Sequence, residues 1–172
     1  NNVVDVSNYV MLETNQPNHA YDFDTLGGNG FRVRLARDGE VLVTLDDVAR
    51  TLTADDLLIC DATDRPIGIA GIMGGAVSEI SEGTTSVLME SANWNGPSIL
   101  LASRDLALRS EASSRFEKQL HPEMATRAQL VAAKLMAEVC GAEAVPGMVD
   151  VAEPLPEPDT IRLRAGRVER IL

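Results

Sequence analysis

The chain of 172 residues is poor in aromatic and basic side chains. Aromatic residues make up 3% of the sequence, and 15 Lys and Arg stand against 26 Asp and Glu, for a formal net charge of −11. Proteins that grip a phosphate backbone do so through Lys and Arg, and base-stacking platforms need aromatic rings. The composition therefore argues against broad contact with nucleic acid, and any such contact should be local.

Cysteine, histidine and long apolar runs are also scarce. The two cysteines, Cys60 and Cys140, are far apart and show no Cys/His spacing typical of zinc, so we expect reduced, buried thiols and no metal site. No apolar run approaches the roughly 20 residues that span a bilayer, and no export signal is visible. We expect a cytoplasmic protein without a membrane partner.

What is present is an ordinary globular composition, with 45% hydrophobic residues. Residues 1–14 show helical spacing of apolar side chains, with no capping residue ahead of Asn1, which suggests a chain truncated at its beginning. From residue 31 apolar side chains alternate with polar ones on both sides of Asp38-Gly39, which predicts a hairpin. Further strands are predicted at 57–61, 66–75 and 86–92.

The second half of the chain is predicted to be helical. Pro97 suits a first helical turn, and Ser110 and Ser113 are candidate caps of the next helix. A third helix follows Pro122 and ends at Gly141. Its apolar stripe is predicted to contain Met124, Ala128, Val131, Leu135 and Val139. Strands followed by helices predict an α+β fold, a mixed or antiparallel sheet with helices packed on it.

The composition also predicts domain boundaries. Residues 1–150 should form one domain. Residues 151–160 contain Pro154, Pro156 and Pro158 among acidic residues and predict a semi-rigid linker. Residues 161–172 should begin a neighbouring domain.

The glycine-rich stretch GIAGIMGG at 68–75 does not fit a nucleotide loop. A dinucleotide fingerprint requires a helix directly after the glycines, but AVSEISEGTT follows, and no Gly-Lys-Ser/Thr motif is present. Gly74 and Gly75 instead allow the backbone to approach another group closely.

Two titratable residues have alternative interpretations. Glu90, in an otherwise apolar strand, is either a solvated or cation-paired carboxylate or a partly buried acceptor for a ligand hydroxyl or amine. His19 is either a turn residue bonded to a backbone carbonyl or part of a site. No Ser-His-Asp arrangement can be recognised, and His121 receives no role. The residues Arg104, Arg109, Arg115 and Lys118 are either a solvated face or a small basic strip for an anion.

Several segments together resemble a known family. The segments NNVVDVSNYVMLETNQPNHAYDFDTL, GIAGIMGG, VLMESANW and LALRSEASSRFEKQLHPEM, in this order and spacing, resemble the central editing module of the bacterial phenylalanyl-tRNA synthetase beta subunit. The resemblance covers about residues 1–150 and implies the fold of that editing domain. It implies hydrolysis of tyrosine wrongly attached to the tRNA for phenylalanine, tRNA(Phe).

The resemblance also implies partners. They are the tRNA 3′ end and an alpha subunit that carries ATP- and Mg-dependent aminoacylation, in an α2β2 heterotetramer. No cofactor is expected in this chain itself.

The resemblance implies roles for individual residues. His19 would orient substrate or water, and Glu90 would read the tyrosine hydroxyl. Ser7 and Ser110 stand where the family usually has threonine. The matching pocket positions are Asn8, His19, Gly74, Glu90, Ser110 and Ala112, and backbone amides near Gly74 and Gly75 could stabilise an oxyanion.

An aminoacyl ester is already reactive, so a positioned water suffices and no covalent nucleophile is required. Two alternatives remain at this point: a free-standing editing hydrolase, and a catalytically silent scaffold that only contacts the partner subunit.

Overall fold

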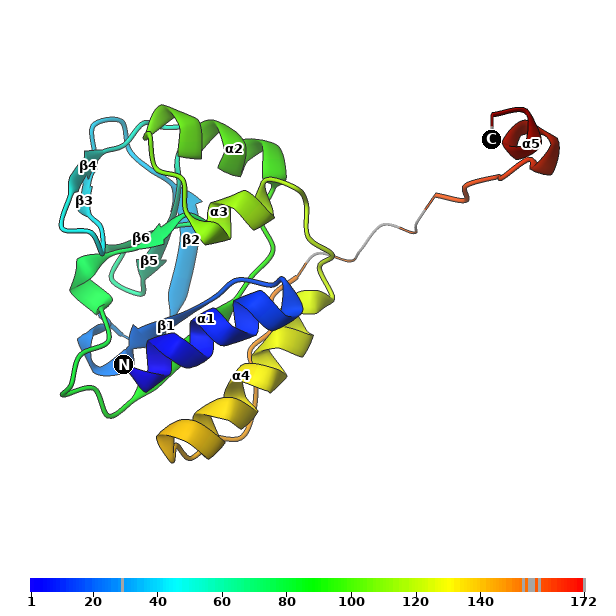
Figure 1. The fold of residues 1–172 in the computed structure, drawn as a ribbon. Coiled ribbons are helices and arrows are strands. Elements are labelled where there is room, and N and C mark those ends of the chain that lie inside the picture. The colour runs from blue at the N-terminus through cyan, green and yellow to red at the C-terminus, as the bar shows by residue number, and fades with distance from the viewer. Residues whose placement is uncertain (29, 153, 155–156, 158, 172) are drawn as a thin grey trace.

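The computed structural model describes residues 1–28, 30–152, 154, 157 and 159–171. The described strands all lie before residue 92, and most helices lie after it (Figure 1). The predicted strand at 66–75 is divided into strands at 66–69 and 73–74, and the strands at 18–22 and 49–51 were not predicted. The elements are α1 (Asn2–Thr14), β1 (Asn18–Asp22), η1 (Phe23–Thr25), β2 (Phe31–Leu35), β3 (Val41–Val43), β4 (Ala49–Thr51), β5 (Leu57–Asp61), β6 (Pro66–Ile69), β7 (Met73–Gly74), η2 (Ala76–Ser78), β8 (Val87–Ser91), α2 (Gly96–Asp105), α3 (Glu111–Phe116), α4 (Met124–Cys140) and α5 (Ala165–Ile171).

The strands form antiparallel sheets. Four strands pair in the order β2-β5-β6-β7, β1 pairs with β8, and β3 pairs with β4. A single bridge between Thr44 and Gly75 joins the β3–β4 hairpin to the end of β7. The α+β class with antiparallel sheets is therefore confirmed.

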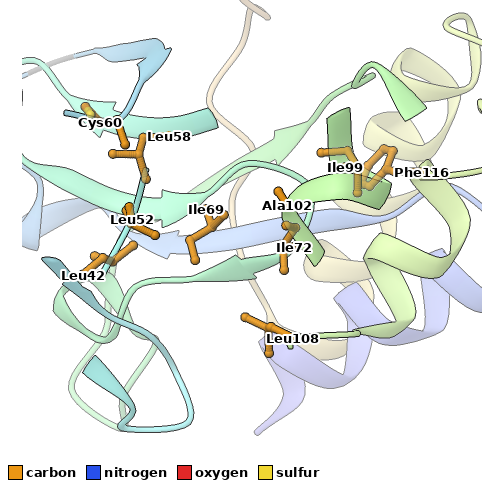
Figure 2. Close-up of a cluster of buried hydrophobic side chains, with 11 residues drawn as sticks. Leu42, Leu52, Leu58, Cys60, Ile69, Ile72, Ile99, Ala102, Leu108 and Phe116 are labelled. Carbon is orange, nitrogen blue, oxygen red and sulfur yellow. The ribbon is translucent and has the colours of Figure 1, made fainter. Parts of the chain in front are cut away.

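Helices cover this framework from two sides. In Figure 1, α1 and α4 lie next to the β1–β8 pair, whereas α2 and α3 lie above the larger sheet. The main hydrophobic cluster joins that sheet to α2 and α3 through residues such as Leu58, Ile69, Ile99 and Phe116 (Figure 2). A second cluster packs α1 against α4 and reaches Met89 of β8. Burial of these apolar side chains is the main force that holds the layers together.

The helix caps largely follow the sequence. Ser110 caps α3 in a reciprocal capping box with Ser113, and Gly141 ends α4 in the left-handed conformation. At the start of α1 the cap is Asn1 itself, whose side-chain oxygen accepts a hydrogen bond from the Val4 amide.

The hairpin predicted around Asp38-Gly39 was wrong. Gly39 does adopt a positive φ of 79°, but β2 pairs with β5 and β3 pairs with β4. The side chain of Arg34 bonds both Glu40 and Asp64, which holds β2 against the turn that joins β5 to β6. These contacts over a long stretch of sequence override the local turn signal.

The apolar stripe of α4 was only partly right. Ala128 is fully buried, but its buried companions are Ala132 and Met136, and Val139 is 52% exposed. Steps of four residues keep these positions against α1, where small alanines let the helices approach.

The predicted linker lies partly outside the described residues, including Pro156 and Pro158, and α5 follows it. The domain boundaries stay predictions. Cys60 is buried and Cys140 partly buried, and both are free thiols. Across the described ranges, no helix is long and apolar enough to cross a membrane, and no cluster of His, Cys, Asp and Glu could hold a metal ion.

Candidate functional site

The β1–β8 ladder brings the two predicted titratable residues together. His19 lies directly opposite Glu90, although they come from distant parts of the chain. Because side chains alternate along strands, His19, Tyr21 and Glu90 share one face. On the other face Met89 packs into the α1–α4 cluster, and Gln129 of α4 donates to the Met89 carbonyl. One face of the pair is thus held by helices, and the other carries the polar residues.

Glu90 is a partly buried carboxylate with one protein donor. Its Oε2 accepts a hydrogen bond of 2.6 Å from the hydroxyl of Tyr21. Burial raises the pKa of Glu90 to about 7, and the Tyr21 bond opposes that rise. No cation pairs with Glu90 among the described residues. The alternative of a solvated or cation-paired carboxylate is therefore not supported.

His19 is a strand residue, so the interpretation as a turn residue was wrong. Its imidazole stands edge-on to the Tyr21 ring at 4.4 Å between centroids, and its Nε2 is buried without a hydrogen-bond partner in the described part of the chain. Burial lowers the pKa of His19 to about 4, so the ring is neutral at neutral pH. A neutral imidazole with an unused ring nitrogen can hold a water or a ligand hydroxyl.

Gly74 approaches His19 so closely that no side chain fits. A Cβ built at Gly74 would lie 2.5 Å from His19 Nε2 and 2.6 Å from its Cε1. Gly74 was predicted to let the backbone approach another group closely, and in this structure that group is the His19 imidazole. Gly75 differs, because its amide already donates to the Ile67 carbonyl at 2.7 Å. The Gly75 amide is therefore not a free oxyanion donor.

Ser110 and Ala112 lie on the other side of β7. The Ser110 hydroxyl donates to the Ile72 carbonyl at 2.7 Å, two residues before Gly74. Ala112 packs, partly buried, against the main hydrophobic cluster. These contacts fix the start of α3 to the β6–β7 connection.

Asn8 is exposed on α1, and the preceding residue, Ser7, is hydrogen-bonded to β1. Ser7 donates through Oγ to the Asn18 carbonyl at 3.0 Å, and Asn18 returns a bond to the Ser7 carbonyl at 3.2 Å. The structure thus brings His19 next to Glu90 and Gly74 next to His19, and it connects Ser110 to this group through Ile72. It does not bring Asn8 to them, because α1 packs on the other face of the β1–β8 pair.

Sequence reasoning missed Tyr21. It is 1% exposed, bonds Glu90 and packs on His19. The signal was available, because a residue two positions after His19 in a strand must share its face.

The four residues of the predicted basic strip lie in two different environments. Arg104, Arg109 and Arg115 are each paired with a neighbouring carboxylate, at Asp105, Glu117 and Glu111. Three of the four residues therefore do not form a free anion site.

Lys118 instead lines a cleft of about 300 Å³ between the end of α1 and the α3–α4 connection. His121, which had no predicted role, lines the same cleft, together with Thr14, Asn15, Gln16, Gln119, Leu120 and Met124. Gln16 is three residues before His19, so the cleft lies at the end of the ladder that carries the site.

A comparison with protein families matches residues 1–141 to the B3/4 domain. The chain belongs to the B3/4 domain family. Curated relatives are each described as a phenylalanine–tRNA ligase beta subunit. One from Halalkalibacterium halodurans is 55% identical over 152 residues, 88% of this chain and 19% of the relative. One from Moorella thermoacetica is 48% identical over the whole chain and 21% of the relative. One from Streptococcus pneumoniae is 50% identical over 153 residues, 89% of this chain and 19% of the relative.

The family resemblance read from the motifs is therefore confirmed, and this B3/4 domain chain spans about a fifth of the length of the relatives it matches. Ser7 and Ser110, the two positions at which the resemblance implied threonine, both contribute to the fold. Both hydroxyls make hydrogen bonds, Ser7 to Asn18 and Ser110 to Ile72.

Proposed function

We propose that this B3/4 domain is the editing site of a phenylalanine–tRNA ligase and hydrolyses tyrosyl-tRNA(Phe). The observation that carries the proposal is Glu90, a partly buried carboxylate with one protein donor, directly opposite the neutral His19. A carboxylate with unused acceptor capacity is the group expected to recognise a hydroxyl.

The chemistry of selection supports the same conclusion. Tyrosine and phenylalanine differ by one hydroxyl, which a purely apolar pocket exploits poorly. A site built to bond that hydroxyl rejects the analogue lacking it by up to roughly 10⁴–10⁵-fold in favourable cases. With a phenylalanyl ester the acceptor of Glu90 would stay unpaired, at a cost on the order of 1–3 kcal/mol. The wrong product is thereby selected and the right one spared.

The hydrolysis needs a positioned water rather than a nucleophilic side chain. The ester is activated, and His19, directly opposite Glu90 in the ladder, has a ring nitrogen, Nε2, that makes no hydrogen bond to the described residues. Gly75 does not supply the oxyanion contact, because its amide is already bonded. His19 therefore has the role of orienting the water or the substrate.

We propose the partners from the relatives' description. The alpha subunit would carry aminoacylation with ATP and Mg, in a cytoplasmic α2β2 assembly, and this domain would meet only the 3′ end of tRNA. The net charge of −11 supports a local contact. Asn8, Ser110 and Ala112 are proposed to line the outer part of the pocket.

The test is deacylation of tyrosyl- and phenylalanyl-tRNA(Phe) by the two-subunit enzyme, parent against Glu90→Ala. We expect the variant to lose its preference for the tyrosyl ester while aminoacylation continues. Glu82→Ala, at an exposed position, is the matched control and should edit like the parent. If Glu90→Ala handles both esters like the parent, the pocket is elsewhere.

His19→Ala in the same assay should slow deacylation without abolishing it. Unchanged single-turnover rates would remove His19 from the site. A parent enzyme that hydrolyses neither ester would favour the silent scaffold.

A further inference from the structure

Tyr21 is the residue that connects the parts of the site. Its hydroxyl donates to Glu90 Oε2 at 2.6 Å and its ring stands edge-on to the His19 imidazole at 4.4 Å. The ring itself is clamped by Ile59, Ile67 and Ala70, with which it forms a buried cluster. The hydroxyl is therefore delivered to Glu90 from a ring with little freedom to move.

Tyr21 acts as a hydrogen-bond donor throughout the working pH range. Burial and the charge of Glu90 raise the pKa of Tyr21 well above its usual value of 10. The phenol therefore keeps its proton, and the direction of the bond is fixed from Tyr21 to Glu90.

The second oxygen of Glu90 has a different environment. Oε1 makes no hydrogen bond to the described residues, and it is not one of the fully buried side-chain atoms left without a partner. One carboxylate oxygen is thus held by the protein, and the other is open to a ligand. An ionised carboxylate can accept at both oxygens simultaneously.

We propose that Tyr21 is a positioning and specificity-determining residue, which holds Oε2 of Glu90 so that Oε1 reads the hydroxyl of the tyrosyl ester. The inference rests on the proposed editing function and adds to it a residue that touches Glu90 and not the reacting ester. In the parent protein Glu90 then receives one hydrogen bond from Tyr21 and a second from the substrate.

The same bond affects the protonation of Glu90. The titratable groups that face Glu90 are Tyr21 and His19 of β1. From α4, which packs against β8, the uncharged Gln129 donates to the Met89 carbonyl. Burial raises the pKa of Glu90 to about 7, and the Tyr21 bond lowers it. Removal of the hydroxyl should therefore raise that pKa, so that less carboxylate is available at neutral pH.

The test uses Tyr21→Phe in the two-subunit enzyme, because this change removes only the hydroxyl. We expect the ratio of kcat/KM for the tyrosyl ester to that for the phenylalanyl ester to fall about tenfold. The acid limb of the pH profile for the tyrosyl ester should move to higher pH. Tyr9→Phe, at a tyrosine 54% exposed on α1, is the matched control and should behave like the parent.

A double-variant cycle with Glu90→Gln separates positioning from general packing. If Tyr21 acts through Glu90, Tyr21→Phe should have no further effect on selectivity in the Glu90→Gln background. An equal loss in both backgrounds, or an unchanged ratio and pH profile in Tyr21→Phe alone, overturns the proposal. A parent enzyme without preference for the tyrosyl ester overturns the editing function and this inference together, whereas a selective parent with a normal Tyr21→Phe overturns the inference alone.

Discussion

Two buried carboxylates in this molecule have opposite surroundings. Asp61, at the end of β5, has a fully buried side chain and accepts hydrogen bonds from Gly27, Thr63 and Arg65, five in all. Glu90, in β8, accepts one, from Tyr21. Both sit on strands, yet only Asp61 has its acceptors filled.

The pKa values follow this difference. Burial alone would raise the pKa of Asp61, but the bonds from the Thr63 hydroxyl and the backbone amides outweigh it and lower the value to about 2. For Glu90 burial dominates, and the pKa rises to about 7. The number of donors distinguishes a carboxylate that stabilises the fold from one that is left available to a ligand.

The largest effect is expected when Asp61 is removed. Asp61→Ala leaves the Arg65 guanidinium and several amides without their acceptor, so it should lower the free energy of unfolding by about 3–5 kcal/mol. Urea denaturation measures the change. Asp105→Ala is the control, since Asp105 pairs with Arg104 at the surface with 63% of its side chain exposed, and it should change stability by less than about 0.5 kcal/mol. If Asp61→Ala and Asp105→Ala lower the free energy of unfolding equally, the hydrogen bonds to Asp61 contribute little to stability.

The contribution of Glu90 to the free energy of unfolding should depend on pH in the opposite direction to that of Asp61, whose pKa is lowered. The folded-state pKa of Glu90, about 7, lies above the ordinary 4.5, so the folded protein holds the proton more tightly and stability falls as pH rises between these values. Glu90→Gln lacks this titratable group, so its stability should not fall in this way. Between pH 4.5 and 7 the free energy of unfolding of the variant should therefore rise by about 3 kcal/mol relative to that of the parent. Thermal unfolding at a series of pH values checks this. If the stabilities of the parent and of Glu90→Gln change with pH in the same way, Glu90 is solvated.

The smallest effects are expected from two glycines, one beside Asp61 and one beside His19, the cross-strand partner of Glu90. A Cβ at Gly27 would lie 2.8 Å from Asp61 Oδ2, and one at Gly74 would lie 2.5 Å from His19 Nε2. Each Ala variant should cost about 1–3 kcal/mol of stability. Only Gly74→Ala should also impair deacylation of tyrosyl-tRNA(Phe), because it displaces His19.

Gly30→Ala, where nothing lies within 4 Å of the added atom, is the control for both glycine variants. If Gly27→Ala impairs editing as strongly as Gly74→Ala, the division between a stabilising and a functional carboxylate fails.

The sequence predicted the elements whose signals are local. Pro97, Ser110 and Gly141 act on their own helices, and β5 and β8 appear as short apolar runs, so these parts could be read directly. The pairing of β2 with β5 could not, because it depends on the ion pairs of Arg34 with residues up to 30 positions away. A turn signal such as Asp38-Gly39 states that the chain bends, not which strands then pair.

The sequence predicts the members of the candidate site, but it does not predict how they lie relative to one another. His19, Gly74 and Glu90 were found through the family resemblance, but the register that sets His19 against Glu90 is a property of the folded sheet. The bond from Tyr21 to Glu90 depends on the same register. For this reason no role was predicted for Tyr21, and the His19 ring was not identified as the group that Gly74 approaches.

The pairing of β1 with β8 has a consequence for biosynthesis. Tyr21 and Glu90 are separated by 69 positions, and β8 is the only strand that pairs with β1 in the described sheets. At about 5–20 residues per second, roughly 3–14 seconds pass on the ribosome between the synthesis of the two strands. During that interval β1 exposes an open edge, which is a template for pairing with other chains. The same arrangement that defines the site therefore creates an interval during synthesis in which a nascent chain can aggregate.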